Sequence, residues 1–258
     1  MPGRSWFLPI AGMLTGTAWL ALVLWERSPY GRYLEHANWT EVGLGATICR
    51  ATPAASFLLP AVIYAGGWLL MIAAMMLPTT LPLLRQFLRV VAARRSRGKL
   101  IMLLIGGYML AWIGFGIAAH SADAVLHLAA RRSVWLAANG WLVGAAVLAT
   151  AGLFQFTALK YRCLDKCRTP FSLIAQHWRG RAPYCDALRL GLHHGLFCVG
   201  CCWAIMLLMF VVGTANLGWM LLLGTIMAVE KNASWGRRVA RPLGLVLLLG
   251  AGLVLIAG

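Results

Sequence analysis

Charged residues are scarce in this sequence, and acidic residues are the scarcest of all. Only 12% of the 258 residues are charged and 61% are apolar, with 7 Asp and Glu against 23 Lys and Arg. An ordinary soluble domain is about 25% charged and about 45–50% apolar. These proportions exclude such a domain, and the 12 Trp and the long aliphatic runs exclude an intrinsically disordered chain. They predict a protein that lies in a lipid bilayer.

Several motifs of common protein classes are also absent. The sequence has no Walker loop, no dinucleotide-binding glycine fingerprint and no nucleophile elbow. These absences argue against ATP-driven pumping by this chain alone and favour a protein that is not an enzyme. No helix-turn-helix or RNA-binding motif accompanies the net charge of +16, so we expect no nucleic-acid partner. The seven Cys are an odd number, and several lie inside apolar runs, which excludes a disulfide-stapled secreted scaffold.

Seven apolar segments have the length of membrane spans, or nearly so. A bilayer core needs about 20 apolar residues in a helix, and the sixth segment is shorter than this. We predict an all-α, polytopic transmembrane helix bundle that forms one integral membrane domain over residues 1–258. The predicted spans are residues 6–25, 56–78, 100–120, 134–157, 190–212, 217–229 and 243–258.

The distribution of basic residues predicts the orientation of this bundle. With seven spans, 18 of the 23 Lys and Arg fall in segments on the N-terminal side of the membrane, and 5 fall on the other side. Cytoplasmic loops carry the excess of Lys and Arg in membrane proteins. We therefore expect a cytoplasmic N-terminus and a multi-pass protein of the bacterial cytoplasmic (inner) membrane, with the lipid bilayer as its first partner.

The fifth predicted span carries an imidazole and three thiols on one helical face. His194 precedes Cys198 by four residues, and Cys201 and Cys202 follow Cys198 by three and four residues. Residues at these spacings are neighbours on a helix. A single buried Cys is often a small packing residue, but three Cys in five residues beside a His favour a metal site. Such ligands suit copper(I), with zinc as the second choice.

A second pair of cysteines, Cys163 and Cys167, lies in the predicted cytoplasmic segment after the fourth span. The Cys-x3-Cys spacing is short enough for both thiols to hold one metal ion. The same pair could instead form a regulatory disulfide or have only a structural role, although a cytoplasmic setting disfavours a disulfide.

Two further features complete the candidate ligands. Met75 and Met76 end the second span, and thioethers select copper(I) over harder ions. Methionines at helical spacing also pack well in cores, so both interpretations stay open. Glu230 ends the sixth span, where a carboxylate could attract a cation or could extend to the membrane interface.

These motifs occur in the order found in a known bacterial family. The stretch from residue 68 to residue 231 resembles the predicted metal-binding integral membrane proteins of domain of unknown function 2182. The resemblance implies a polytopic inner-membrane protein with a role in metal handling, and copper-chaperone descriptions of some members point to copper. It is carried by Trp68, the Ala-Met-Met-x-Pro block ending at Pro78, Cys163-x3-Cys167, His177-Trp178, Gly191-x2-His194, Cys198-x2-Cys201-Cys202-Trp203, Asn216 and Glu230-Lys231.

Three functions are consistent with these observations. The leading hypothesis is the binding of a soft metal, copper(I) first, for transport, buffering or delivery, with a co-encoded metallochaperone or membrane protein as a further partner. The second is a membrane thiol-disulfide oxidoreductase that uses the Cys-x2-Cys spacing of Cys198 and Cys201. The third is a membrane subunit that scaffolds a larger complex and in which the cysteines only pack.

Overall fold

A computed structural model describes residues 7–27, 58–212 and 216–257, and it contains helices and no strand in these ranges. The all-α prediction is therefore confirmed for the described part of the chain. The α-helices are α1 Phe7–Glu26, α3 Leu58–Met76, α4 Leu81–Val90, α5 Arg97–Arg132, α6 Val134–Ala138, α7 Trp141–Phe154, α8 Ala158–Arg168, α9 Pro170–His177, α10 Pro183–Val212, α11 Leu217–Asn232 and α12 Ala240–Ala257. Two short 3-10 helices, η4 Pro78–Thr80 and η5 Gly236–Arg238, precede α4 and α12.

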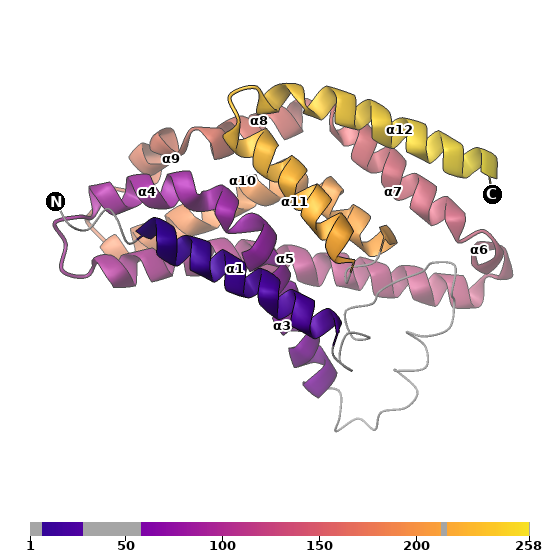
Figure 1. Ribbon diagram of the computed structural model, residues 1–258, viewed down its shortest axis with the longest axis horizontal. Helices are drawn as coiled ribbons and strands as arrows, with labels where there is room; N and C mark the ends of the chain where they lie inside the picture. Colours follow the sequence, from indigo (N-terminus) through magenta and orange to yellow (C-terminus); the bar gives the residue numbers. More distant parts are fainter. Residues whose placement is uncertain (1–6, 28–57, 213–215, 258) are drawn as a thin grey trace.

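Helix α10 is the element around which the others are arranged. It packs against α5 along an extensive seam and also contacts α7, α8, α9 and α11 (Figure 1). Glycines permit the close approach of α5 and α10. A Cβ added to Gly191 would run into the backbone of Leu104, and one added to Gly107 would run into the backbone of Leu188. Small residues serve this purpose where two helices cross at short distance.

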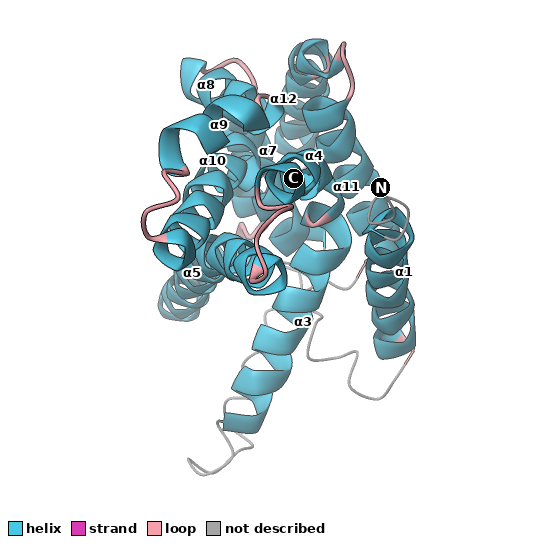
Figure 2. Ribbon diagram, turned by 90° about the vertical axis from the view of Figure 1, so that its left-hand side faces the viewer, coloured by secondary structure: helices cyan, strands magenta, loops and turns pink. Residues whose placement is uncertain are grey.

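The remaining helices form pairs around this centre. Helix α12 lies along α7, and α1 lies along α3 (Figure 1). Helix α11 contacts α3, α8 and α10, so it joins the N-terminal helices to the central one. The view turned by 90° shows α8 and α9 at the edge of the bundle beside α10 (Figure 2).

Each of the seven predicted spans coincides with helix, but the helices and the predicted spans differ in length. Helices α5 and α10 extend well past the predicted bounds, and the fourth predicted span contains α6 and α7. By length and composition, three stretches of the described chain could cross a membrane: α5, α10 and the segment Gly236–Ala257 that contains α12. Two bent pairs, α3 with α4 (45°) and α7 with α8 (64°), would raise the number to five. Seven spans and a cytoplasmic N-terminus therefore stay predictions.

The bend after α3 has a local cause. Helix α3 ends at Met76, and Pro78 begins η4 two residues later. Proline lacks the N–H group of an α-helical hydrogen bond and its ring collides with the preceding turn. The hydroxyls of Thr79 and Thr80 then donate to the carbonyls of Met76 and Leu77, each at 2.7 Å. This arrangement turns the chain and leaves the last residues of α3 buried in the interior.

Candidate metal centre

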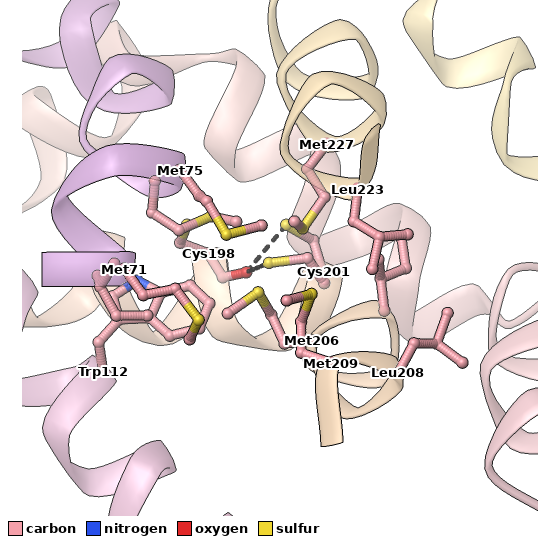
Figure 3. Close-up of a cluster of buried hydrophobic side chains, with 14 of the residues drawn as sticks. Met71, Met75, Trp112, Cys198, Cys201, Met206, Leu208, Met209, Leu223 and Met227 are labelled. Carbon is pink, nitrogen blue, oxygen red and sulfur yellow. Dashed lines mark hydrogen bonds between the residues drawn. The ribbon is translucent and has the colours of Figure 1, made fainter. Parts of the chain in front are cut away.

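The interior of the bundle is rich in sulfur. Five cysteines and seven methionines belong to one buried cluster formed mainly by α3, α8, α10 and α11. Figure 3 shows several of these side chains pointing toward one another from three helices. The sulfur-bearing members are Cys163, Cys167, Cys198, Cys201, Cys202, Met71, Met75, Met76, Met206, Met209, Met220 and Met227. We call this set the sulfur cluster.

The three thiols of α10 occupy one turn of the helix. The Sγ atoms of Cys201 and Cys202 donate to the backbone carbonyl of Cys198, at 3.1 and 2.8 Å (Figure 3). These contacts follow from the i, i+3 and i, i+4 spacings, which place the later side chains over the earlier carbonyl. The Sγ atom of Cys198 itself lies 3.2 Å from the hydroxyl of Tyr108 on α5. All three cysteines are 1% exposed, so the thiols lie in the interior and not on the surface.

Helix α8 brings the second pair of cysteines to the first. The Sγ atom of Cys167 lies 4.0 Å from that of Cys201. Cys163 lies over Gly200, where an added Cβ would come within 2.7 Å of its Sγ. No disulfide is formed among the described cysteines. The two motifs, more than 30 residues apart in the sequence, therefore lie side by side in the fold.

The methionines predicted from α3 lie in the same cluster. Met76 is fully buried, and Met75 is 3% exposed and packs against Gly224 of α11. The thioether of Met76 and the thiol of Cys198 share a neighbour, because both lie near the ammonium of Lys231. The structure thus brings the predicted thioether groups to the predicted thiols.

Lys231 lies at the sulfur cluster, although the spacing and charge patterns did not predict it as a site residue. Its Nζ lies 2.9 Å from Cys198 Sγ and 3.6 Å from both Cys202 Sγ and Met76 Sδ. In the count of Lys and Arg on the two sides of the membrane, Lys231 is only one of the bases that are predicted to be cytoplasmic. Two signals were available in the sequence: its position directly after a carboxylate at the end of an apolar helix, and its place in the Glu230-Lys231 pair of the family resemblance. Its ammonium places a positive charge inside the sulfur cluster.

Glu230 has a different neighbour from the thiols. Both of its carboxylate oxygens accept from Lys160 Nζ, at 2.9 and 2.8 Å, and the two side chains are 0% and 2% exposed. The guanidinium of Arg168 adds donations to the carbonyls of Glu230 and Ser234. These bonds fasten α8 to the end of α11, and so they hold Cys163 and Cys167 in place against α10.

His194 lies next to the cysteines with one ring nitrogen unpaired. The residue is 3% exposed, and its ring centroid is 5.8 Å from that of Tyr108. Its Nδ1 atom is buried and has no hydrogen-bond partner among the described residues. Buried polar atoms nearly always have a partner. An unpaired imidazole nitrogen beside buried thiols therefore fits a site that receives a ligand.

The donor set determines which ions this site can hold. Within the described residues, no three His, Cys, Asp or Glu side chains converge closely enough to enclose an ion by themselves. The cluster instead offers pairs of thiols together with thioethers, which are soft ligands. Between helices, the thiol of Cys167 lies next to that of Cys201, and the ammonium of Lys231 lies beside Cys198.

Comparison with known proteins agrees with this chemistry. A family model named PpoB2 and described as copper chaperone matches residues 65–254. The matched part includes α8, α10, α11 and the part of α3 from residue 65 onward, and with them every residue of the sulfur cluster. No curated protein and no solved structure matches the chain.

Proposed function

Because the chain belongs to the PpoB2 family of copper chaperones, we propose that it is a bacterial inner-membrane protein that binds copper(I) at the sulfur cluster and delivers it to a partner. The observation that carries the proposal is the convergence of two separate cysteine motifs and the methionines of α3 around Cys198. Transport or buffering of the ion would use the same ligands, but delivery is the role that the family description favours.

The chemistry of the donors favours copper(I) over zinc. Structural zinc sites are almost always tetrahedral and use four Cys, His or carboxylate ligands. The described residues offer no such set of three or more converging groups, whereas thiols and thioethers lie together in the cluster. Soft sulfur ligands select copper(I). We therefore propose copper(I) as the cargo and assign zinc no site of its own.

The charge in the cluster supports the same cargo. Two thiols that bind copper(I) release two protons, and the resulting bis(thiolate) complex carries one negative charge. A buried charge needs a partner of opposite sign. The Lys231 ammonium beside Cys198 and Cys202 supplies that charge, so the loaded cluster is neutral overall. In this account Lys231 is a positioning residue that balances the charge of the bound ion.

The positions of the thiols suggest an order of exchange. Cys163 and Cys167 come from α8 at the edge of the bundle, and Cys198, Cys201 and Cys202 come from the central helix (Figure 2). We propose that the ion passes from the thiols of α8 to those of α10, with Met75, Met76 and His194 as further ligands. In this proposal Glu230 is not a ligand. Its ion pair with Lys160 holds α8 against α11.

The surface of the helices supports insertion in a membrane. Large apolar side chains are exposed on the helices that meet the length and composition of spans, such as Met102 (74%), Ile117 (64%), Leu249 (69%) and Ile256 (85%). Exposed apolar surface of this extent is typical of lipid-facing helices. An impermeant maleimide tests both location and orientation. The exposed Cys185 is predicted to be cytoplasmic, so it should react in inverted vesicles and stay unreacted in intact cells.

A thiol-disulfide oxidoreductase is the second candidate, and one observation favours it. Cys167 Sγ and Cys201 Sγ lie 4.0 Å apart, so a small movement would allow a disulfide of about 2.05 Å. This pair differs from the Cys-x2-Cys pair of Cys198 and Cys201 that the spacing suggests. Alkylation of thiols after equilibration with glutathione buffers would reveal a potential-dependent pair if this function is correct.

Metal content tests the proposed function. Protein is purified anaerobically in detergent from cells supplied with copper, zinc and iron together, and its metals are measured by elemental analysis. After dialysis against a competing copper(I) chelator, we expect bound copper in the wild type and its loss when Cys198 and Cys202 are both replaced by Ala. Cys185→Ala is the matched control, because this cysteine is exposed and lies outside the sulfur cluster. Copper that resists this dialysis in the double variant, or the absence of such copper from the wild type under reducing conditions, contradicts the proposal.

A further inference from the structure

Two histidines, one on α9 and one on α10, lie close together with tilted rings. His177 is the last residue of α9, and His193 lies on α10 one residue before the buried His194. Their ring centroids are 4.2 Å apart and the ring planes are tilted by 41°. Both side chains are partly exposed, so solvent reaches the pair while the thiols of the sulfur cluster stay buried.

The hydrogen bonds of the two rings prepare them to bind a metal. His177 Nδ1 lies 3.1 Å from the carbonyl of Leu173, and His193 Nδ1 lies 2.8 Å from the carbonyl of Arg189. A carbonyl oxygen can only accept, so each Nδ1 donates, and the tautomer with its single proton on Nδ1 has a lone pair on Nε2. Metal-binding histidines typically donate their other N–H to such a group, which fixes the tautomer and the ring orientation. Neither Nε2 has a hydrogen bond to the described residues.

Contacts at the connection between α9 and α10 keep the two imidazole rings close together. The carboxylate of Asp186 accepts from the backbone N–H groups of Arg179 and Gly180, at 3.2 and 2.9 Å. Trp178, which directly follows His177, packs edge-to-face on Phe87 with ring centroids 4.9 Å apart. These hydrogen bonds and this ring contact restrain the turn between α9 and α10, and so they restrain the positions of the two histidines.

The pair lies N-terminal to the α10 cysteines of the sulfur cluster, on the part of α10 that contacts α9. His193 precedes Cys198 by five residues on α10, a distance of about 7.5 Å along the axis at about 1.5 Å per residue. Helices α8 and α9 run beside the same helix, with Cys167 close to Cys201 and His177 close to His193. The imidazole pair is thus partly exposed, and the thiols further along α10 are buried.

We infer that His177 and His193 form a second copper site, which holds copper(I) between the two Nε2 atoms before the ion moves to the sulfur cluster. The inference rests on the proposed function for the identity of the ion. Neutral imidazoles bind copper ions, and thiolates are the softer ligands that select copper(I). The exposed imidazole pair therefore binds more weakly and loads the ion, and the buried thiols retain it.

Titration with copper(I) against a competing chelator separates the two sites. The wild-type chain should take up copper in a strong phase and a weak phase. The combined His177→Ala and His193→Ala variant should lose only the weak phase, and Gln176→Ala, an exposed neighbour on α9, should keep both. The single variant His193→Gln, which retains a side chain of similar size, should also lose the weak phase if the double variant does not fold.

A variant without the α10 cysteines shows which of the two proposals fails, the histidine site or the sulfur cluster. With Cys198 and Cys202 replaced by Ala, the strong phase should disappear and the weak phase should remain. In that variant, one equivalent of copper(I) should protect His177 and His193 from diethylpyrocarbonate, as read by peptide mass spectrometry. A weak phase that survives the histidine substitutions, or no protection of the two rings, overturns the inference. A strong phase that survives the cysteine substitutions overturns the proposed function instead.

Discussion

Replacing Lys160 with Met should destabilise the fold far more than the loss of a surface charge would. Lys160 Nζ lies 2.8 and 2.9 Å from the two carboxylate oxygens of Glu230, and the side chains are 0% and 2% exposed. At 2.8 Å and an effective dielectric constant of about 20, the attraction between two unit charges is about 6 kcal/mol. Much of this energy offsets the cost of removing both charges from water. Removal of one partner leaves a buried carboxylate without a cation, which typically costs about 3–5 kcal/mol.

The measurement is equilibrium unfolding of the purified protein in mild detergent, followed by the fluorescence of its tryptophans. The single variant Lys160→Met should be less stable by about 3–5 kcal/mol, which lowers Tm by about 6–20 °C at about 2–4 °C per kcal/mol. The double variant with Glu230→Met removes both charges and should recover most of the lost stability. A single variant within about 1 kcal/mol of the wild type, the value of an exposed pair, would refute the reasoning. A double variant as unstable as the single one would refute it too.

Three further predictions concern the interior. Lys231→Met should weaken copper(I) binding at least about tenfold, which is about 1.4 kcal/mol, as measured by competition with a chelator. An unchanged affinity would show that Lys231 does not balance the charge of the bound ion. Gly191→Ala should destabilise the protein in the same unfolding assay, because the added Cβ meets the backbone of α5. Gly106→Ala has open space around the added Cβ and should stabilise the helix by roughly 0.5–1 kcal/mol. Tyr108→Phe removes the hydroxyl 3.2 Å from Cys198 Sγ and should cost about 1 kcal/mol of stability; no change in unfolding would show that this contact is energetically neutral.

The spacing of residues along one helix was predictable, because helical geometry is local. The apolar runs indicated each helix, Pro78 indicated the end of α3, and the spacings in α10 placed His194, Cys198 and Cys202 on one face. Two helices ran longer than their predicted spans because the length of a helix is not limited to the thickness of a bilayer. Local spacing therefore gave the ligand types of the candidate site but not its full composition.

The contacts between helices were not predictable from the same patterns. The approach of Cys167 to Cys201 depends on α8 folding back against α10, and the Lys160–Glu230 pair then joins α8 to α11. The position of Lys231 among the sulfurs depends on where α11 ends relative to α3 and α10. Charge counting places a lysine on one side of a membrane, but it does not reveal which side chains the ammonium meets.

The copper K-edge X-ray absorption spectrum of the protein, loaded anaerobically with one equivalent of copper(I), tests the central claim most directly. The account predicts a copper(I) edge and a first coordination shell made mostly of sulfur, which loses its sulfur contribution in the variant with Cys198 and Cys202 replaced by Ala. A first shell of nitrogen and oxygen alone in the wild-type protein would contradict the assignment of the sulfur cluster as the copper site.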